Sequence, residues 1–93
     1  MAGSAPDRWR VQIAPTAARD LDGIGEPDHA RLRRRILSLE DDPRPAGVVK
    51  LKDRLHRVRQ GDWRILYALD DGIRLVTILR VLRRNERTYR HLA

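Results

Sequence analysis

The chain of 93 residues contains no cysteine, no phenylalanine and only two lysines among its twenty basic residues. Without cysteine it has no disulfide framework, no thiolate ligand for a metal and no thiol nucleophile. Its histidines, at positions 29, 56 and 91, are far apart and lack the spacing of metal ligands. No apolar run is long enough to cross a membrane, and the first residues lack a signal-peptide pattern. We therefore expect a soluble cytoplasmic protein that uses no metal or other cofactor.

Basic charge is concentrated in the second half of the chain. Residues 1–49 hold eight arginines and eight acidic residues, whereas residues 50–93 hold twelve basic residues and five acidic ones. The net charge of +7 therefore belongs to the second half. A general preference for arginine does not explain this difference between the halves. The asymmetry predicts an anionic partner, either a nucleic acid or an acidic protein.

The first half of the chain has the pattern of one strand followed by two helices. Apolar residues alternate with polar ones over residues 9–13, as in a half-buried strand. Pro15 suits the first turn of a short helix, and a second helix is expected over residues 27–39 with an apolar stripe. Residues 41–47 carry two prolines and a glycine and form a loop. Residues 1–6 are expected to be frayed.

The second half of the chain has the pattern of consecutive strands. Strands are expected over residues 55–59, 63–69 and 73–82, separated by turns at Gln60-Gly61 and at residues 70–72. Residues 85–91 are expected to form a last helical turn or an extended tail. The order β-α-α-β-β-β predicts a single α+β domain over residues 1–93. In it, an antiparallel helix hairpin covers one face of a sheet that includes a three-stranded antiparallel meander.

Three arginines are predicted to share one face of the first hairpin. If Gln60 and Gly61 form a two-residue turn, Arg57 lies opposite Arg64, and Arg59 lies on the same face. The core face then carries Val58, Trp63, Ile65 and Tyr67. Like charges placed opposite each other repel, and an anion between them relieves the repulsion. The arginine face is therefore either a phosphate site or a solvated surface partly neutralised by Asp62.

The two lysines, Lys50 and Lys52, stand two residues apart in a segment expected to be extended, so they should project to the same side. Arginine keeps its proton near neutral pH, whereas lysine can lose one when it is crowded by other cations. A proton acceptor among arginines would therefore have to be a lysine. The alternative is a pair of surface lysines that simply follow a loop.

The tail of the chain adds further basic residues. Residues 80–90 contain five arginines and Tyr89. Basic side chains interleaved with an aromatic ring suit RNA, whose unstacked bases settle on flat rings, although a lone tyrosine can equally pack at a core edge. His56 falls on the core side of the sheet by alternation, which favours a buried structural role.

The segment from Val49 to Tyr67, VKLKDRLHRVRQGDWRILY, resembles the central signature of the RelE/ParE toxins of type II toxin–antitoxin systems. That signature is a lysine-leucine segment followed by R-x-R-x-G-D-aromatic-R-I-(I/L)-Y. The N-terminal strand, the helix start at residues 17–21, the loop at Pro43 and the tail from Arg83-Arg84 to Tyr89 also sit where the family has them. The resemblance covers nearly the whole chain and implies the RelE-like fold.

The resemblance implies a ribosome-dependent, metal-independent endoribonuclease that cleaves mRNA in the ribosomal A site by attack of a 2′-hydroxyl. The residues that it implies as catalytic are Lys52, Lys50, Arg59, Arg83 and Tyr89. The residues that we expect to bind RNA, from the hairpin face and the basic tail, are Arg57, Arg64, Arg84 and Arg87. The implied partners are the ribosome, mRNA and an antitoxin with a RelB-like acidic, helical segment. Toxin and antitoxin could assemble as a heterotetramer. No membrane partner is implied.

Two departures from the family pattern leave residue roles open. Leu82 stands where the family often has a histidine, so Arg83 and Arg84 both remain candidates for the tail arginine. His56 stands where an aromatic residue is common, so the general acid is open between His56 and Tyr89. An alternative function comes from the ParE branch, which shares the fold and is thought to bind DNA gyrase without cleaving RNA.

Overall fold

The computed structural model describes residues 8–84. Expectations for the frayed start at residues 1–6 and for the last helical turn or tail at residues 85–91 fall outside these residues. The elements, in chain order, are β1 (Arg10–Ile13), α1 (Pro15–Asp22), α2 (Asp28–Ser38), β2 (Val49–Lys52), β3 (Leu55–Gln60), β4 (Trp63–Asp70) and β5 (Leu75–Arg83).

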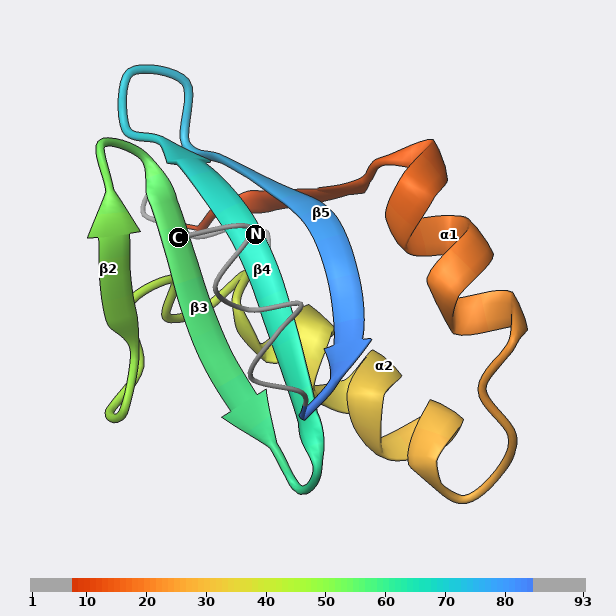
Figure 1. Ribbon diagram of the computed structural model, residues 1–93. Helices are drawn as coiled ribbons and strands as arrows, with labels where there is room; N and C mark the ends of the chain where they lie inside the picture. Colours follow the sequence, from red (N-terminus) through yellow and green to blue (C-terminus); the bar gives the residue numbers. More distant parts are fainter. Residues whose placement is uncertain (1–7, 85–93) are drawn as a thin grey trace.

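The five strands form one sheet in the order β1-β5-β4-β3-β2 (Figure 1). The strand β1 runs parallel to β5, and all other neighbours are antiparallel. The predicted α+β fold class is confirmed, but the sheet has one strand more than predicted, because β2 pairs with β3. This strand escaped prediction because it has only four residues and a bulge interrupts its alternation.

Each helix begins and ends close to where the sequence pattern predicts. The helix α1 starts at Pro15, whose missing N–H is not needed in the first turn, and buries Ala17 and Leu21 four residues apart. The helix α2 starts at Asp28, whose carboxylate suits the N-terminal end of the helix dipole. It buries Leu32 and Ile36 with the same four-residue spacing.

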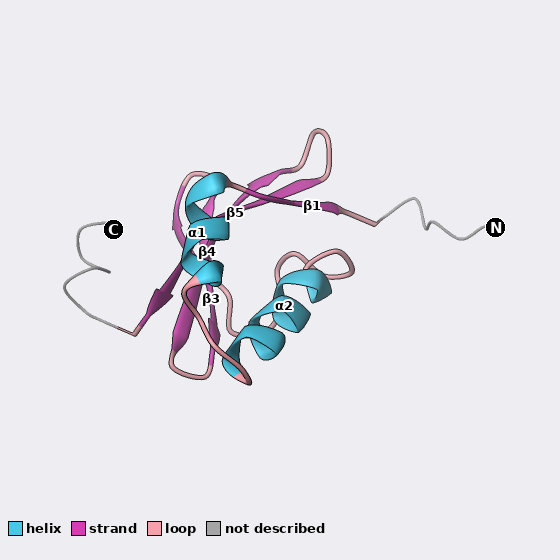
Figure 2. Ribbon diagram, turned by 90° about the vertical axis from the view of Figure 1, so that its right-hand side faces the viewer, coloured by secondary structure: helices cyan, strands magenta, loops and turns pink. Residues whose placement is uncertain are grey.

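The hydrophobic core lies between the helices and one face of the sheet. In Figure 1 the chain descends along α1 and returns along α2, and Figure 2 shows α2 on one side of the strands. The sheet contributes seven buried residues to this core: Val58, Ile65, Tyr67, Leu69, Val76, Ile78 and Val81. On β4 these residues alternate strictly, so the helices cover a single face, as predicted. The other face is turned away from both helices.

Three polar contacts fix the sheet relative to its surroundings. The carboxylate of Asp20 in α1 accepts hydrogen bonds from Arg80 Nε at 2.8 Å and from the Val81 backbone N–H at 2.9 Å. The buried Tyr67 hydroxyl donates to the Pro43 carbonyl at 2.8 Å. The Trp63 indole N–H donates to the Asp28 carboxylate at 3.0 Å. These contacts join both helices and the 41–47 loop to the central strands.

Candidate functional site

The β3–β4 hairpin places three arginines on the face turned away from the helices. Arg59 lies directly opposite Arg64, and Arg57, two residues earlier on β3, shares their face. The predicted shared face is confirmed, but the predicted pairing of Arg57 with Arg64 is wrong. The hairpin turns at residues 61–62, so the register moves by two residues, and a shift of two keeps every side chain on its face. We call Arg57, Arg59 and Arg64 the arginine face.

The turn itself explains the shifted register. Gly61 has φ +59°, in the left-handed region that favours glycine, and Gln60 pairs with Trp63 on either side of the turn. Beyond the turn, the Arg84 backbone N–H donates to the Asp62 carbonyl at 2.6 Å, which holds the end of β5 against the hairpin.

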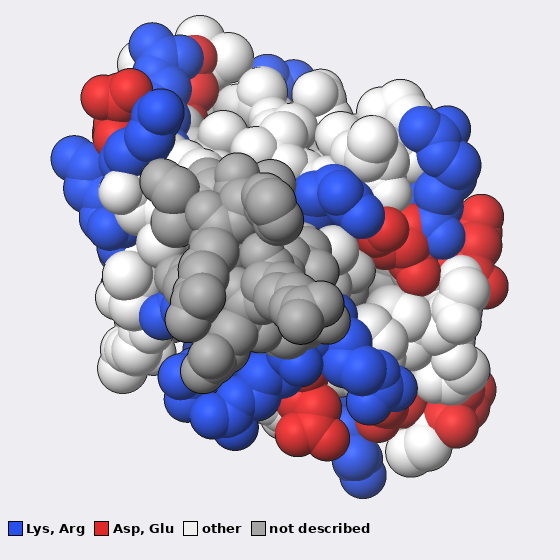
Figure 3. Space-filling model, in the orientation of Figure 1, with Lys and Arg blue, Asp and Glu red and all other residues white. Residues whose placement is uncertain are grey.

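The arginine face concentrates positive charge that the described carboxylates do not fully balance. Arg59 is exposed and forms no ion pair with a carboxylate of residues 8–84. Arg64, directly opposite, is buried to 8% exposure. Figure 3, which views the same side as Figure 1, shows more basic than acidic side chains in its lower part, where the hairpin ends. Two arginines at directly paired positions on one face suit an anion with several acceptor oxygens, such as a phosphate.

The two lysines do not share a side of the sheet. Lys50 pairs with His56 and Lys52 pairs with Leu55, so the residue between them is an extra, bulged residue. His56 belongs to the helix-covered face and Leu55 to the other one, and directly paired residues share a face. Lys52 therefore lies on the side of the arginine face and Lys50 on the opposite side. The prediction that both lysines project together is wrong.

A second bulge, in β5, determines on which side of the sheet Arg83 lies. The strand β5 pairs Arg80 with Leu66 but Ile78 with Tyr67, which leaves Leu79 as an extra residue. From that point the alternation reverses, and Arg83 pairs with Trp63 on the helix-covered side. Its guanidinium lies 4.6 Å from the centre of the Trp63 ring, a cation–π contact.

Arg83 therefore lies apart from the arginine face, although the family resemblance implied that it acts together with Arg59. Arg84, the next residue, lies beyond the end of β5, and its side chain is exposed. Arg87 and Tyr89 lie outside the described residues.

An apolar depression of about 700 Å³ lies beside Lys52. Its lining residues are Lys52, Asp53, Arg54, Leu55, Ala68 and Leu79. Sequence reasoning missed this hollow, because the bulge that brings Leu79 to it cannot be recognised from hydropathy. The depression places an apolar surface on the same side of the sheet as the three arginines.

His56 is buried in this fold, as its position in the strand predicted. It is 4% exposed, its Nδ1 lies 2.8 Å from the Arg54 carbonyl oxygen, and its ring stacks on Tyr67 at 5.8 Å between centroids. Burial raises the pKa of Tyr67 to about 12, although Arg35 and Arg44 act in the opposite direction. Within residues 8–84 no group of three or more histidine, aspartate or glutamate side chains is close enough to hold a metal ion. None of the helices in that range is long and apolar enough to span a bilayer.

Comparison with known proteins agrees with this geometry. A model of the family described as "ParE toxin of type II toxin-antitoxin system, parDE" matches residues 11–88. Toxin RelE of Mycobacterium tuberculosis (strain ATCC 25618 / H37Rv) is 36% identical over 80 residues, covering 83% of this chain and 82% of that toxin. The chain belongs to the RelE/ParE family of toxins. The family expected from the signature around Arg59 is thus confirmed.

Solved structures of RelE toxins share the fold. One is the toxin–antitoxin complex RelBE2 of Mycobacterium tuberculosis, with a TM-score of 0.74 and 28% identity over 83% of this chain and 99% of that chain. Another is the archaeal RelE–RelB complex of Pyrococcus horikoshii OT3, with a TM-score of 0.77 and 26% identity over 84% of this chain and 97% of that chain. The curated relative and both complexes carry the RelE name, so the RelE branch of the family is favoured over the gyrase-binding alternative.

Proposed function

We propose that this RelE/ParE-family protein is a ribosome-dependent endoribonuclease that cleaves mRNA in the ribosomal A site and so inhibits translation. The observation that carries this proposal is the pair Arg59 and Arg64, which face each other on a sheet surface turned away from both helices. A phosphodiester placed between the two guanidinium groups would relieve their repulsion and accept several charge-assisted hydrogen bonds.

The proposed reaction transfers the phosphodiester to the neighbouring 2′-hydroxyl of the same RNA strand. The 2′-oxygen loses its proton and bonds to phosphorus, and the bond from phosphorus to the 5′-oxygen breaks. The 5′-oxygen then takes up a proton, which leaves a cyclic phosphate and a 5′-hydroxyl. The pentacoordinate phosphate carries extra negative charge, which Arg59 and Arg64 would stabilise, with Arg57 alongside.

Lys52 is the proposed acceptor of the 2′-hydroxyl proton. It lies on the side of the arginine face, and an amine, unlike a guanidinium, can exist without its extra proton near neutral pH. Lys50, on the other side of the sheet, is no longer its equivalent. Tyr89, in the tail, remains the proposed general acid. Alternatively, its ring stacks on a nucleotide base. We do not assign the acid to His56, because it is 4% exposed and its ring stacks on Tyr67.

The ribosome and the antitoxin complete the proposal. A sheet of this size offers little surface to hold and bend mRNA, so the ribosome would supply the positioning that makes the attack effective. The apolar depression lined by Leu55, Ala68 and Leu79 offers a surface for a nucleotide base next to Lys52. The RelBE2 complex and the archaeal RelE–RelB complex each contain an antitoxin. We infer a cognate antitoxin with an acidic or amphipathic segment that covers the basic surface in an inactive complex.

The proposal is tested with purified protein and ribosomes programmed with a defined mRNA. The expected result is cleavage within the A-site codon and none of the same mRNA without ribosomes. Cleavage should persist in EDTA at concentrations that leave the ribosome intact. Intact mRNA together with inhibition of DNA supercoiling by gyrase would overturn the proposal and assign the protein to the other branch of its family.

A further inference from the structure

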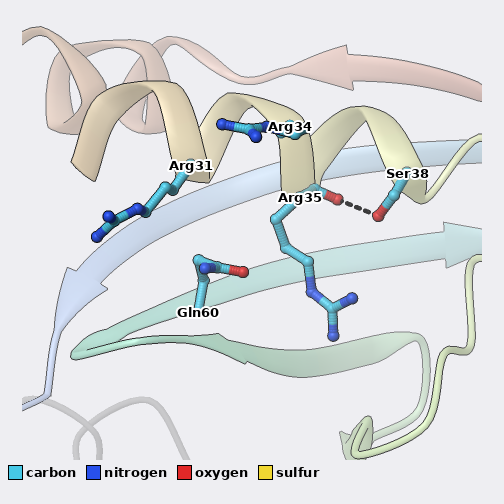
Figure 4. A pocket seen from close by; sticks show the side chains of 5 residues that line it. All are labelled: Arg31, Arg34, Arg35, Ser38 and Gln60. Carbon is cyan, nitrogen blue, oxygen red and sulfur yellow. Dashed lines mark hydrogen bonds between the residues drawn. The ribbon is translucent and has the colours of Figure 1, made fainter. Parts of the chain in front are cut away.

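A second basic site lies on the helix side of the same hairpin. A hollow of about 400 Å³ opens between α2 and the end of β3. Its lining residues are Arg31, Arg34, Arg35, Ser38 and Gln60. Figure 4 shows Arg31 and Arg35 extending from α2 toward the strand that carries Gln60, with the Gln60 amide between them.

Within this hollow no carboxylate balances the arginines, although Asp28 and Asp62 line an adjoining hollow that shares Arg31 and Gln60. No acidic residue lines the first hollow itself, and none of Arg31, Arg34 and Arg35 forms an ion pair within the described part of the chain. The nearby Asp28 carboxylate already accepts a hydrogen bond from the Trp63 indole at 3.0 Å. Like charges three and four residues apart on a helix repel one another. The hollow therefore concentrates positive charge at a cost that a bound anion would offset.

The available hydrogen-bond donors also suit an anion. Arg35 Nε is buried and has no hydrogen-bond partner in residues 8–84, an arrangement that is costly unless a ligand completes it. The Ser38 hydroxyl is already used, since it donates to the Arg35 carbonyl at 2.6 Å. The donors left for a ligand are thus the three guanidinium groups and the Gln60 amide.

The position of the hollow indicates which anion it takes. Gln60 follows Arg59 directly, so the hollow and the arginine face lie at the same end of the β3–β4 hairpin, on its two sides. An isolated carboxylate could satisfy one of these sites, whereas a chain of regularly spaced phosphates could engage both. Phosphate oxygens also accept several arginine donors at once.

We infer that the hollow of Arg31, Arg34, Arg35 and Gln60 binds a phosphodiester of single-stranded RNA away from the bond that is cut. This inference rests on the proposed function in taking RNA as the ligand. The hollow takes no part in the cleavage chemistry; it adds affinity and fixes the path of the strand around the hairpin.

The test measures binding of an RNA that cannot be cleaved. The probe is a 2′-O-methyl oligonucleotide of about twelve nucleotides, bound to the full chain at a series of salt concentrations and followed by fluorescence anisotropy. The variant is Arg31→Gln/Arg34→Gln. Its matched control is Arg33→Gln/Arg19→Gln, which removes the same charge from exposed positions outside the hollow.

We expect the Arg31→Gln/Arg34→Gln variant to lose about ten-fold in affinity near physiological salt. Its log–log salt slope should fall by roughly 0.7 for each phosphate contact removed. The control should stay within about two-fold of the unmodified protein, because Arg19 and Arg33 are exposed and do not line the hollow. Arg35→Lys tests the buried Nε in the same assay, since it keeps the charge but removes the fork of donors, and it should weaken binding. All variants should stay folded, and Arg31→Gln/Arg34→Gln should be at least as stable as the unmodified protein, because it removes like charges from one helix face.

Equal affinities and slopes for the two double variants would overturn the inference. It would also be overturned if Arg31→Gln/Arg34→Gln weakened binding of the cognate antitoxin while the RNA slope stayed unchanged. Failure of the proposed function is a separate result: mRNA on programmed ribosomes stays intact, yet only the hollow variant loses RNA affinity. That result supports the RNA subsite and removes the cleavage proposal.

Discussion

Asp20 accepts several hydrogen bonds that connect α1 to the sheet. Its carboxylate accepts from Arg80 Nε at 2.8 Å, from Arg80 Nη2 at 3.2 Å and from the Val81 N–H at 2.9 Å, and it thereby ties α1 to the second half of β5. The hydrogen bond to Asp20 raises the pKa of Arg80 above its usual value. This contact joins residues sixty positions apart, so no local sequence pattern predicts it.

Replacing this carboxylate should destabilise the fold. Asp20→Ala leaves the Val81 N–H and the Arg80 guanidinium without their acceptor, and we expect a loss of about 2 kcal/mol in the free energy of unfolding. Asp22→Ala is the matched control, because Asp22 is exposed on the same helix, and it should change stability by less than about 0.5 kcal/mol. Urea denaturation measures both. Equal effects of the two substitutions would contradict the role given to Asp20.

Tyr67 gives the fold a defined response to alkaline pH. Burial raises its pKa from 10.0 to about 12, so between these values an unfolded chain loses the phenolic proton and the folded chain keeps it. The contribution is complete below pH 10 and disappears as the pH approaches 12. In that window the unfolding free energy should decline by about 1.4 kcal/mol per pH unit because of this residue.

The variant Tyr67→Phe isolates the effect. It should cost about 1 kcal/mol at neutral pH, since the Pro43 carbonyl loses its donor, and it should show a shallower decline above pH 10 than the unmodified protein. Urea titrations at several pH values compare the two proteins. Parallel stability profiles through the alkaline range would show that the hydroxyl titrates alike in the folded and unfolded chains.

The strands show how far alternation predicts side-chain positions. On β3 and β4 the pattern correctly placed Val58, Ile65 and Tyr67 in the core and Arg57 and Arg59 on the other face. The predicted position of the turn was wrong, but the face assigned to each side chain was still correct, because the register moved by two residues. At the two bulges the same reasoning failed. A single extra residue reverses the alternation, and neither bulge carries a glycine or proline that would mark it.

Because the bulge in β2 places Lys50 and Lys52 on opposite sides of the sheet, substitutions of the two lysines should differ in their effect on cleavage. Lys52→Arg keeps the charge on the side of the arginine face but removes a group that can release its proton, so single-turnover cleavage should fall roughly 10²- to 10⁴-fold. Lys50→Arg makes the same chemical change on the opposite side of the sheet and should cleave within a few-fold of the unmodified rate. If the two swaps behave alike, Lys52 contributes only charge and the base lies elsewhere.

The turn between β3 and β4 should be sensitive to its glycine. Gly61 has φ +59°, and a Cβ added there meets no atom within 4 Å, so any effect of Gly61→Ala comes from the backbone alone. We expect a loss of about 1–2 kcal/mol in unfolding free energy. Gly25→Ala also meets no neighbour and has no positive φ, and its stability should be unchanged or slightly higher. The comparison is made by thermal or urea unfolding of the two variants.

For the whole molecule, charge and fold class were the properties most readable from the sequence. The excess of seven positive charges after residue 49 falls on the strands of the sheet and the residues that follow it, while the helices belong to the neutral half. Two features could not be predicted from the sequence and are seen only in the folded chain. The hollow of Arg31, Arg34 and Arg35 needs Gln60 from another element, and the position of Arg83 on the helix-covered side depends on the bulge at Leu79.

The most direct test of the account is single-turnover mRNA cleavage on programmed ribosomes by Arg59→Gln, compared with Arg19→Gln. Both substitutions remove one exposed arginine, but only Arg59 belongs to the arginine face. We expect Arg19→Gln to cut the A-site codon at the unmodified rate and Arg59→Gln to be slower by roughly 10²- to 10³-fold, with folding intact. Cleavage by Arg59→Gln at the unmodified rate would contradict the account.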